Sequence, residues 1–104
     1  MEKMEITVTE KDDRTVIKIS GRLDIVSSVE FEKSVNSLFE SGVRNILVDC
    51  SDMEYTSSAG LRVFLLMRKR IESNKGKLIL KALKPEVESV FRMVGFLSMF
   101  DLEA

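Results

Sequence analysis

The sequence predicts a small α/β domain, in which a mixed β-sheet packs against α-helices in the order β-β-α-β-α-β-α. Three observations support this fold. Two segments near the N-terminus alternate β-branched and polar residues, two later segments are short apolar runs, and three segments repeat apolar residues at helical spacing. A chain of 104 residues with 44% hydrophobic content can form one modest core, so we expect residues 1–104 to be a single domain.

The first half of the chain is expected to contain a hairpin, a helix and a buried strand. Residues 5–9 and 15–20 are predicted to be antiparallel strands joined by a short polar connection. A capping-box pattern over 27–30 predicts the start of a helix, and Gly42 its end. The unbroken apolar run 45–50 is typical of a strand covered on both faces.

The second half is expected to contain two further helices around one strand. The apolar residues of segment 57–72 surround the helix axis, so we expect most sides of its first half to be buried. Segment 78–80 is predicted to be a strand, Pro85 to open the last helix and Gly95 to end it. Residues 96–102 either add a short strand or pack as coil. The bulky residues expected in the core are Leu47, Val48, Phe64, Leu65, Leu78, Leu80, Val90 and Phe91.

Composition and charge exclude several classes of function. The 16 basic and 17 acidic residues nearly cancel, so no excess of basic charge supports a nucleic-acid surface. The longest apolar run, 63–67, is far shorter than the ~20 residues that span a bilayer. Acidic residues also stand near the N-terminus, where a signal peptide would have an apolar segment. We therefore expect a cytoplasmic protein without membrane association.

The reactive residue types argue against an enzyme. The chain has no histidine, which removes the commonest general base and every Ser-His-Asp arrangement. Its single cysteine, Cys50, lies beside an apolar strand, which favours a buried, inert thiol. Asp49, Asp52 and Glu54 are close in sequence, but acidic residues on a loop are usually solvated. The turn at Gly60 lacks the second glycine and the lysine of a phosphate-binding loop. We expect no catalytic activity, metal or cofactor.

Adjacent serines stand where the apolar strand gives way to a helix. Thr56, Ser57 and Ser58 are helix-start residues, and a hydroxyl there can accept a hydrogen bond from an amide that otherwise has no partner. This structural role explains only one of the three hydroxyl groups. Because a helix N-terminus also favours anions, a phosphate attached to a serine in the first turn would be tolerated.

Three segments resemble the STAS-domain anti-sigma factor antagonists of bacteria over nearly the whole chain: ISGRLDIVSSVEFEKSV, ILVDCSDMEYTSSAGLRVFLLMRKR and KPEVESVFRMVGF. The resemblance implies that an anti-sigma factor, which is also a serine kinase, phosphorylates the serine at the helix start. The unphosphorylated form binds this partner, so that the sigma factor is released. A phosphatase restores the unphosphorylated form. By match to the motif, the phosphorylated serine is Ser58, within a partner-binding turn of Ser57, Ser58, Ala59 and Gly60.

Three alternatives stay open. Many members carry aspartate immediately before the phosphorylated serine, where this chain has Ser57, so Ser57 is an alternative acceptor. A second contact region, matched by Gly21, Leu23 and Asp24, could instead be a tight turn followed by a helix-start aspartate. The resemblance is also compatible with a STAS subunit of another assembly, such as a stress-signalling scaffold or a transporter-associated protein.

Overall fold

The computed structural model describes residues 4–104 and contains a five-stranded sheet, three α-helices and one short 3-10 helix. The elements are β1 (Glu5–Lys11), β2 (Arg14–Leu23), α1 (Ile25–Glu40), β3 (Asn45–Thr56), α2 (Ser58–Ser73), β4 (Lys77–Lys81), α3 (Pro85–Met93), the 3-10 helix Leu97–Met99 and β5 (Asp101–Glu103). The predicted element order is confirmed, and the tail adds the short strand β5.

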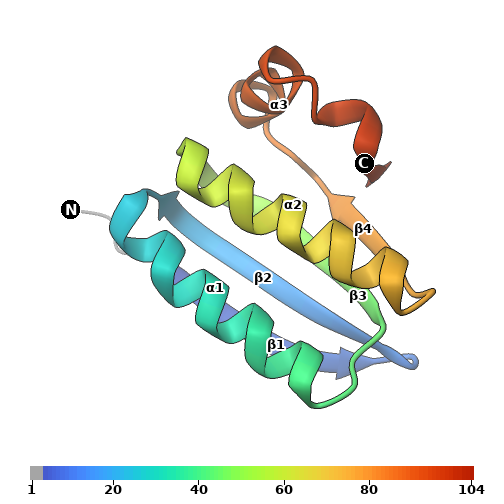
Figure 1. Ribbon diagram of the computed structural model, residues 1–104. Coiled ribbons are helices and arrows are strands. Elements are labelled where there is room, and N and C mark those ends of the chain that lie inside the picture. Colours follow the sequence, from blue (N-terminus) through green and yellow to red (C-terminus); the bar gives the residue numbers. More distant parts are fainter. Residues whose placement is uncertain (1–3) are drawn as a thin grey trace.

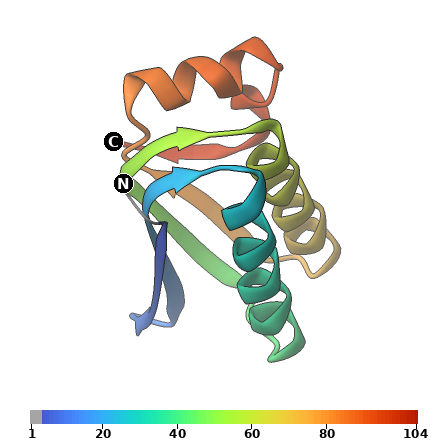
Figure 2. The same ribbon diagram turned by 90° about the vertical axis from the view of Figure 1, so that its left-hand side faces the viewer.

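The strands are arranged in sequence order across the sheet. β1 pairs antiparallel with β2, as the hairpin pattern predicted, and every later pair is parallel. Parallel neighbours need a crossover connection, which α1, α2 and α3 provide. Helices α1 and α2 lie side by side on one face of the sheet, and α3 lies near its end (Figures 1 and 2).

Strands β2 and β3 are longer than predicted. β2 continues from Ser20 to Leu23, and β3 continues six residues beyond Cys50 to Thr56, so that these extensions pair with each other. The ladder is irregular near Gly21, whose φ of 89° lies in the left-handed region that favours glycine. The polar side chains of the β3 extension hid a strand that tertiary pairing with β2 stabilises.

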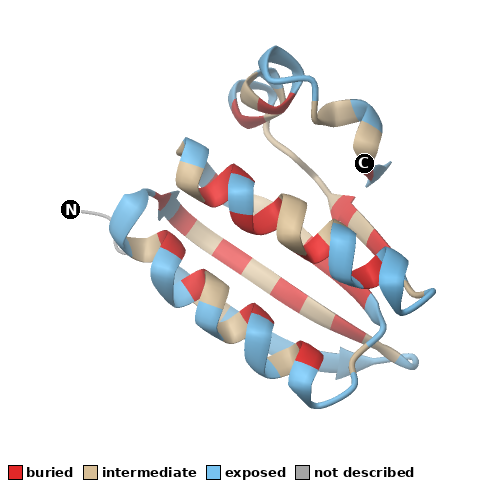
Figure 3. Cartoon of the chain, in the orientation of Figure 1, coloured by how far each residue is buried: buried red, intermediate tan, exposed pale blue. Residues whose placement is uncertain are grey.

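The core lies between the sheet and its helices. Along β2, buried and half-buried residues alternate, which is the period of a strand with one covered face (Figure 3). Phe64 of α2 packs against Phe31 of α1 and Phe91 of α3, with ring centroids 5.2 and 5.3 Å apart. The three α-helices thus share one aromatic cluster.

Six of the eight predicted core residues are buried: Leu47, Val48, Phe64, Leu78, Leu80 and Phe91. Leu65 and Val90 are only half-buried, so this part of the prediction is wrong. Both lie beside the buried stripe of their helix, whose members include Phe64 and Met67 in α2 and Val87 and Phe91 in α3.

The prediction that both faces of strand 45–50 are buried is confirmed at Ile46, Leu47 and Val48, but α1 and α2 do not account for the burial of Leu47. Helices α1 and α2 cover the same face of the sheet (Figure 2). Leu47, which alternates with the core residues Ile46 and Val48, is nevertheless only 4% exposed. Its register neighbours on the two adjacent strands are Val16 and Ile79, so apolar side chains of the sheet itself flank it.

Candidate functional site

The junction between β3 and α2 is fixed to the end of β2 by Ser57. Its backbone N–H donates to the carbonyl of Leu23 at 2.8 Å, and its hydroxyl donates to the same carbonyl at 3.0 Å. The hydroxyl oxygen also accepts from the N–H of Gly60 at 3.2 Å, which makes Ser57 the N-cap of α2. Thr56, by contrast, is buried at the end of β3. The capping role predicted for this trio therefore belongs to Ser57.

Ser58 occupies the first helical position of α2 and is exposed. Its hydroxyl takes no part in the hydrogen bonds that hold the junction. Ala59, the next residue, is half-buried. The two adjacent serines therefore differ in accessibility: Ser57 is half-buried and engaged by the fold, whereas Ser58 presents a free hydroxyl at the positive end of the helix dipole.

Gly60 lets α2 begin close to the end of β2. A Cβ added at Gly60 would lie 2.5 Å from Thr56 Oγ1 and 2.7 Å from Leu23 Cδ2. No real Cβ sits that close to its neighbours, so any other residue would push the helix away from Leu23. Gly60 is buried and acts by allowing this approach, not by presenting a side chain.

Asp24 begins α1 directly after the end of β2. Its carboxylate accepts from the N–H of Ser27 at 2.8 Å, while the Ser27 hydroxyl accepts from the N–H of Asp24 at 2.9 Å. This reciprocal cap places the helix start at Ile25, so the predicted start at the 27–30 capping box is wrong. The hydrogen bond from the backbone of Ser27, followed by that from its side chain, lowers the pKa of Asp24.

The residues matched to the second contact region divide into two groups. Asp24 is exposed, whereas Gly21 and Leu23 are buried in the last residues of β2. Gly21 permits the irregular backbone there, and Leu23 supplies the carbonyl that Ser57 uses. The structure brings the two predicted turns together, and it leaves Asp24 and Ser58 as their exposed members.

An exposed apolar patch beside these turns was missed in the sequence. Ile25, Val26 and Val29 of α1 are 72, 78 and 54% exposed. They lie near the start of α1, after Asp24, and off the buried stripe of Ser28, Phe31, Val35 and Phe39. If the helix had been predicted to start after Asp24, the patch would have been visible in the sequence. Positions 25, 26 and 29 then fall outside the buried stripe of period 3.6. We call Asp24, Ile25, Val26, Val29, Ser58 and Ala59 together the α1–α2 surface.

An ion pair borders the α1–α2 surface, whereas Arg22 lies on the opposite face of the sheet. Arg62 of α2 donates from Nη2 to Glu32 Oε1 of α1 at 2.6 Å, an ion pair that links the two helices on the solvent side. The guanidinium of Arg22 lies 4.2 Å from the ring centroid of Tyr55. Arg22 and Tyr55 pair in the register next to the buried Leu23, so they face the other side of the sheet.

The acidic residues near the junction are separately engaged. Asp49 accepts from the hydroxyl of Ser51, Asp52 lies 3.1 Å from Lys18 Nζ, and Glu54 lies 2.6 Å from Lys84 Nζ. Within residues 4–104, no group of three or more His, Cys, Asp or Glu side chains is placed to hold a metal ion.

Cys50 is buried, and burial raises the pKa of its thiol to about 12. Because the thiolate is the reactive form, this thiol is inert at neutral pH, as the sequence predicted. Over the same described part of the chain, no helix is long and apolar enough to span a membrane.

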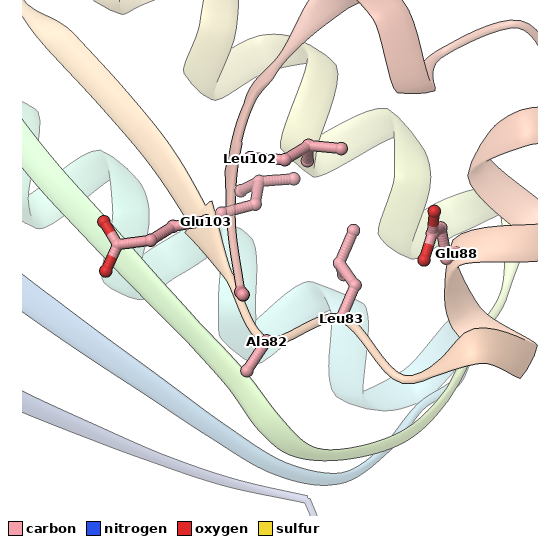
Figure 4. Close-up of a pocket in the computed structure, with 7 residues that line it drawn as sticks. Ala82, Leu83, Glu88, Leu102 and Glu103 are labelled. Carbon is pink, nitrogen blue, oxygen red and sulfur yellow. The ribbon is translucent and has the colours of Figure 1, made fainter.

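A separate pocket of about 430 Å³ lies among β4, β5 and α3 (Figure 4). Leu83 and Leu102 point into it, whereas Glu103 points away. Its other lining residues are Leu80, Ala82, Glu88 and Ala104. It includes no member of the α1–α2 surface.

Known proteins share this architecture over nearly its whole length. BtrV of Bordetella bronchiseptica, named as an anti-sigma factor antagonist, is 34% identical over 97 residues, which are 93% of this chain and 84% of BtrV. A Thermotoga maritima structure of a protein described in the same terms superposes with a TM-score of 0.90 at 23% identity, covering 95% of this chain and 86% of that one. The phosphorylated form of Bacillus SpoIIAA superposes with a TM-score of 0.77 at 20% identity, covering 96% and 91%. Residues 5–104 match the STAS domain family, and the chain belongs to it.

Proposed function

We propose that the chain is an anti-sigma factor antagonist controlled by phosphorylation of Ser58. The unphosphorylated form binds an anti-sigma factor that is also a serine kinase, and so frees the sigma factor. The relative BtrV, named as an anti-sigma factor antagonist, supports the class of partner. The observation that carries the proposal is the juxtaposition of an exposed hydroxyl, Ser58, with exposed Asp24 on two turns joined through Ser57 and Leu23.

The chain acts in this scheme as a binding module in the cytoplasm, not as an enzyme. The partner transfers the γ-phosphoryl group of ATP to Ser58 Oγ: the bond to ADP breaks, the bond to Oγ forms and the hydroxyl proton is released. A phosphatase hydrolyses the ester and restores the hydroxyl. The fold need not change, because the acceptor lies in the first turn of a helix that is already formed.

Charge explains how one phosphate controls binding. The phosphate adds about −1.5 to −2 charges to a surface that already carries the carboxylate of Asp24. Like charges or an unfitted dianion at an interface cost several kcal/mol, and ~1.4 kcal/mol is a tenfold change in affinity. A switch of about a hundredfold is therefore within reach of this single group.

Titration of the purified chain with candidate serine-kinase anti-sigma factors tests the proposal. We expect binding without ATP, loss of binding after incubation with ATP, and ATP-resistant binding by Ser58→Ala. Mass spectrometry of wild type, Ser57→Ala and Ser58→Ala locates the phosphate. Phosphate on Ser57 would move the site by one residue, and its absence from both serines with every cognate kinase would refute the switch. Binding to a non-sigma assembly alone would favour the other STAS role.

The apolar patch offers a second test of where the partner binds. A protein surface that covers the patch buries apolar area, which stabilises the complex by about 25 cal/mol per Å². Val26→Ser should therefore weaken binding about tenfold without unfolding the chain. Met93→Ser is the matched control, because Met93 is 83% exposed on α3 and outside the α1–α2 surface. Equal effects of the two substitutions would place the interface elsewhere.

A further inference from the structure

The ion pair between Arg62 and Glu32 stands one helical turn from the proposed acceptor. Ser58 and Arg62 are separated by four residues in α2, so their side chains are neighbours on the same helix face. Helical side chains lean toward the N-terminus, which directs Arg62 toward Ser58. An acidic group four residues before a basic one is also the favourable order for such a pair.

We propose that Arg62 binds the phosphate on Ser58 and leaves Glu32 when that phosphate is present; this inference rests on the proposed function. Arg62 uses one nitrogen to reach Glu32 in an exposed pair, so the pair is weak and its guanidinium has donors to spare. A phosphate offers three acceptor oxygens and up to twice the charge of a carboxylate. Competition between the two anions therefore favours the phosphate.

Arg22 is a less suitable cation for this role. It pairs in register with Tyr55, and its guanidinium lies over the Tyr55 ring on the sheet face away from Leu23 and α2. Arg62 belongs to α2 itself, as Ser58 does. The helix α2 thus carries both the phosphorylated residue and the cation that binds the phosphate.

The move of Arg62 from Glu32 to the phosphate also changes the charge balance on α1. Once Arg62 turns to the phosphate, the carboxylate of Glu32 has lost its partner. Glu32 is three residues beyond Val29, so it lies next to the apolar patch on the same helix. The partner then meets an uncompensated carboxylate beside the patch as well as a phosphate at Ser58, and both ends of the α1–α2 surface oppose binding.

The test uses the full chain with phosphoserine incorporated at position 58 by genetic code expansion, which requires no kinase or partner. ³¹P NMR titration measures the second pKa of the phosphate. Arg62→Gln should raise this pKa by roughly 0.5 pH unit, because a nearby cation stabilises the dianion. Arg62→Lys should restore part of the shift, because it returns a cation to the same helix face.

Arg70→Gln is the matched control. It removes the same charge from α2, but Arg70 lies about 18 Å along the helix from Ser58 and stacks on Phe39. Equal pKa values for the Arg62→Gln and Arg70→Gln phosphoproteins would overturn the proposal. Failure of kinase or partner assays would instead bear on the proposed function, since this experiment uses neither.

A double-mutant cycle tests the departure from Glu32. In the unmodified protein, the effects of Glu32→Gln and Arg62→Gln on the urea midpoint should be non-additive, because the two side chains are paired. In the phosphoserine protein they should become additive. Non-additivity of the same size in both forms would show that Arg62 stays with Glu32 and would overturn the exchange.

Discussion

Ser57 and Ser58 are chemically identical and adjacent, yet their environments differ. The hydroxyl of Ser57 donates to Leu23 and accepts from Gly60, so its hydrogen-bonding capacity serves the fold. The hydroxyl of Ser58 is exposed on the first turn. Modification of Ser57 would require breaking the contact between β2 and α2, whereas modification of Ser58 would not. This difference predicts distinct consequences for stability.

Ser57→Ala should lower the free energy of unfolding by about 1–2 kcal/mol, the usual cost of removing a helix N-cap. Ser58→Ala should change it by less than about 0.5 kcal/mol, because an exposed side chain away from such features contributes little. Urea denaturation monitored by circular dichroism measures both values. Similar losses for the two variants would contradict the assignment of the cap to Ser57.

Asp24 has two roles: its carboxylate caps α1, and we propose that it also contacts the partner protein. Its pKa is lowered in the folded protein, so the cap contributes stability above the ordinary aspartate range and loses it as pH falls through the lowered pKa. Asp24→Asn keeps a good capping side chain but removes this titration. The difference in unfolding free energy between wild type and Asp24→Asn should therefore shrink below about pH 4.

The same variant separates the two roles of Asp24 in binding. Asp24→Ala removes both cap and charge, whereas Asp24→Asn removes the charge and retains the cap. If the carboxylate contacts the partner, Asp24→Asn should bind weakly while its melting temperature stays near that of wild type. Normal binding by Asp24→Asn, with destabilisation only in Asp24→Ala, would restrict Asp24 to capping.

Among the elements, the approach of α2 to β2 determines the shape of the α1–α2 surface. The helix starts where Gly60 meets Leu23 and Thr56, at distances that leave no space for a Cβ. This contact, together with the Ser57 hydrogen bonds, places the starts of α1 and α2 beside each other. The surface is therefore assembled from the ends of two parallel strands and the helices that follow them (Figure 1).

Gly60→Ala should destabilise the domain by about 1–3 kcal/mol, because Leu23 and Thr56 must shift to admit the methyl group. It should also weaken partner binding. Gly76→Ala is the control: its Cβ would meet the backbone carbonyl of Arg44, beyond the C-terminal end of α2. Gly76→Ala should unfold the protein more readily yet leave the binding of the folded fraction unchanged. If Gly60→Ala and Gly76→Ala both lost stability and partner binding to the same degree, the role of Gly60 would be purely structural.

At the scale of the whole molecule, one aromatic cluster joins elements distant in sequence. Phe64 packs against Phe31 and Phe91, and Phe91 packs in turn against Phe100 at a centroid distance of 5.8 Å. Phe64 has no exposed surface. The cluster thus connects both sheet-covering helices with α3 and the C-terminal segment, and its loss should affect the domain as a unit.

Phe64→Ala should cost about 3–5 kcal/mol, a large part of the 5–15 kcal/mol that usually stabilises a domain. Phe64→Leu keeps most of the apolar volume, so it should remain folded with a smaller loss. Urea midpoints measure both, with an unchanged m-value as evidence of two-state unfolding. A loss below about 1 kcal/mol for Phe64→Ala would contradict its central position.

The sequence by itself determined the element order and most of the core. These features follow from local patterns: alternation in the hairpin, continuous apolar runs in β3 and β4, and helical spacing around Phe64. Such patterns are visible without a partner element because each reflects which sides of a segment must be buried. The inert Cys50 was predictable for the same reason.

Only the tertiary structure decided where β2 and β3 end, where α1 begins and which of the two serines caps α2. The extension of β3 to Thr56 is polar and becomes a strand because β2 pairs with it. The role of Ser57 depends on the carbonyl of Leu23, which lies 34 residues away in the chain. Hydrogen bonds between distant segments leave no periodic signal in a sequence, so the α1–α2 surface became recognisable only in the folded molecule.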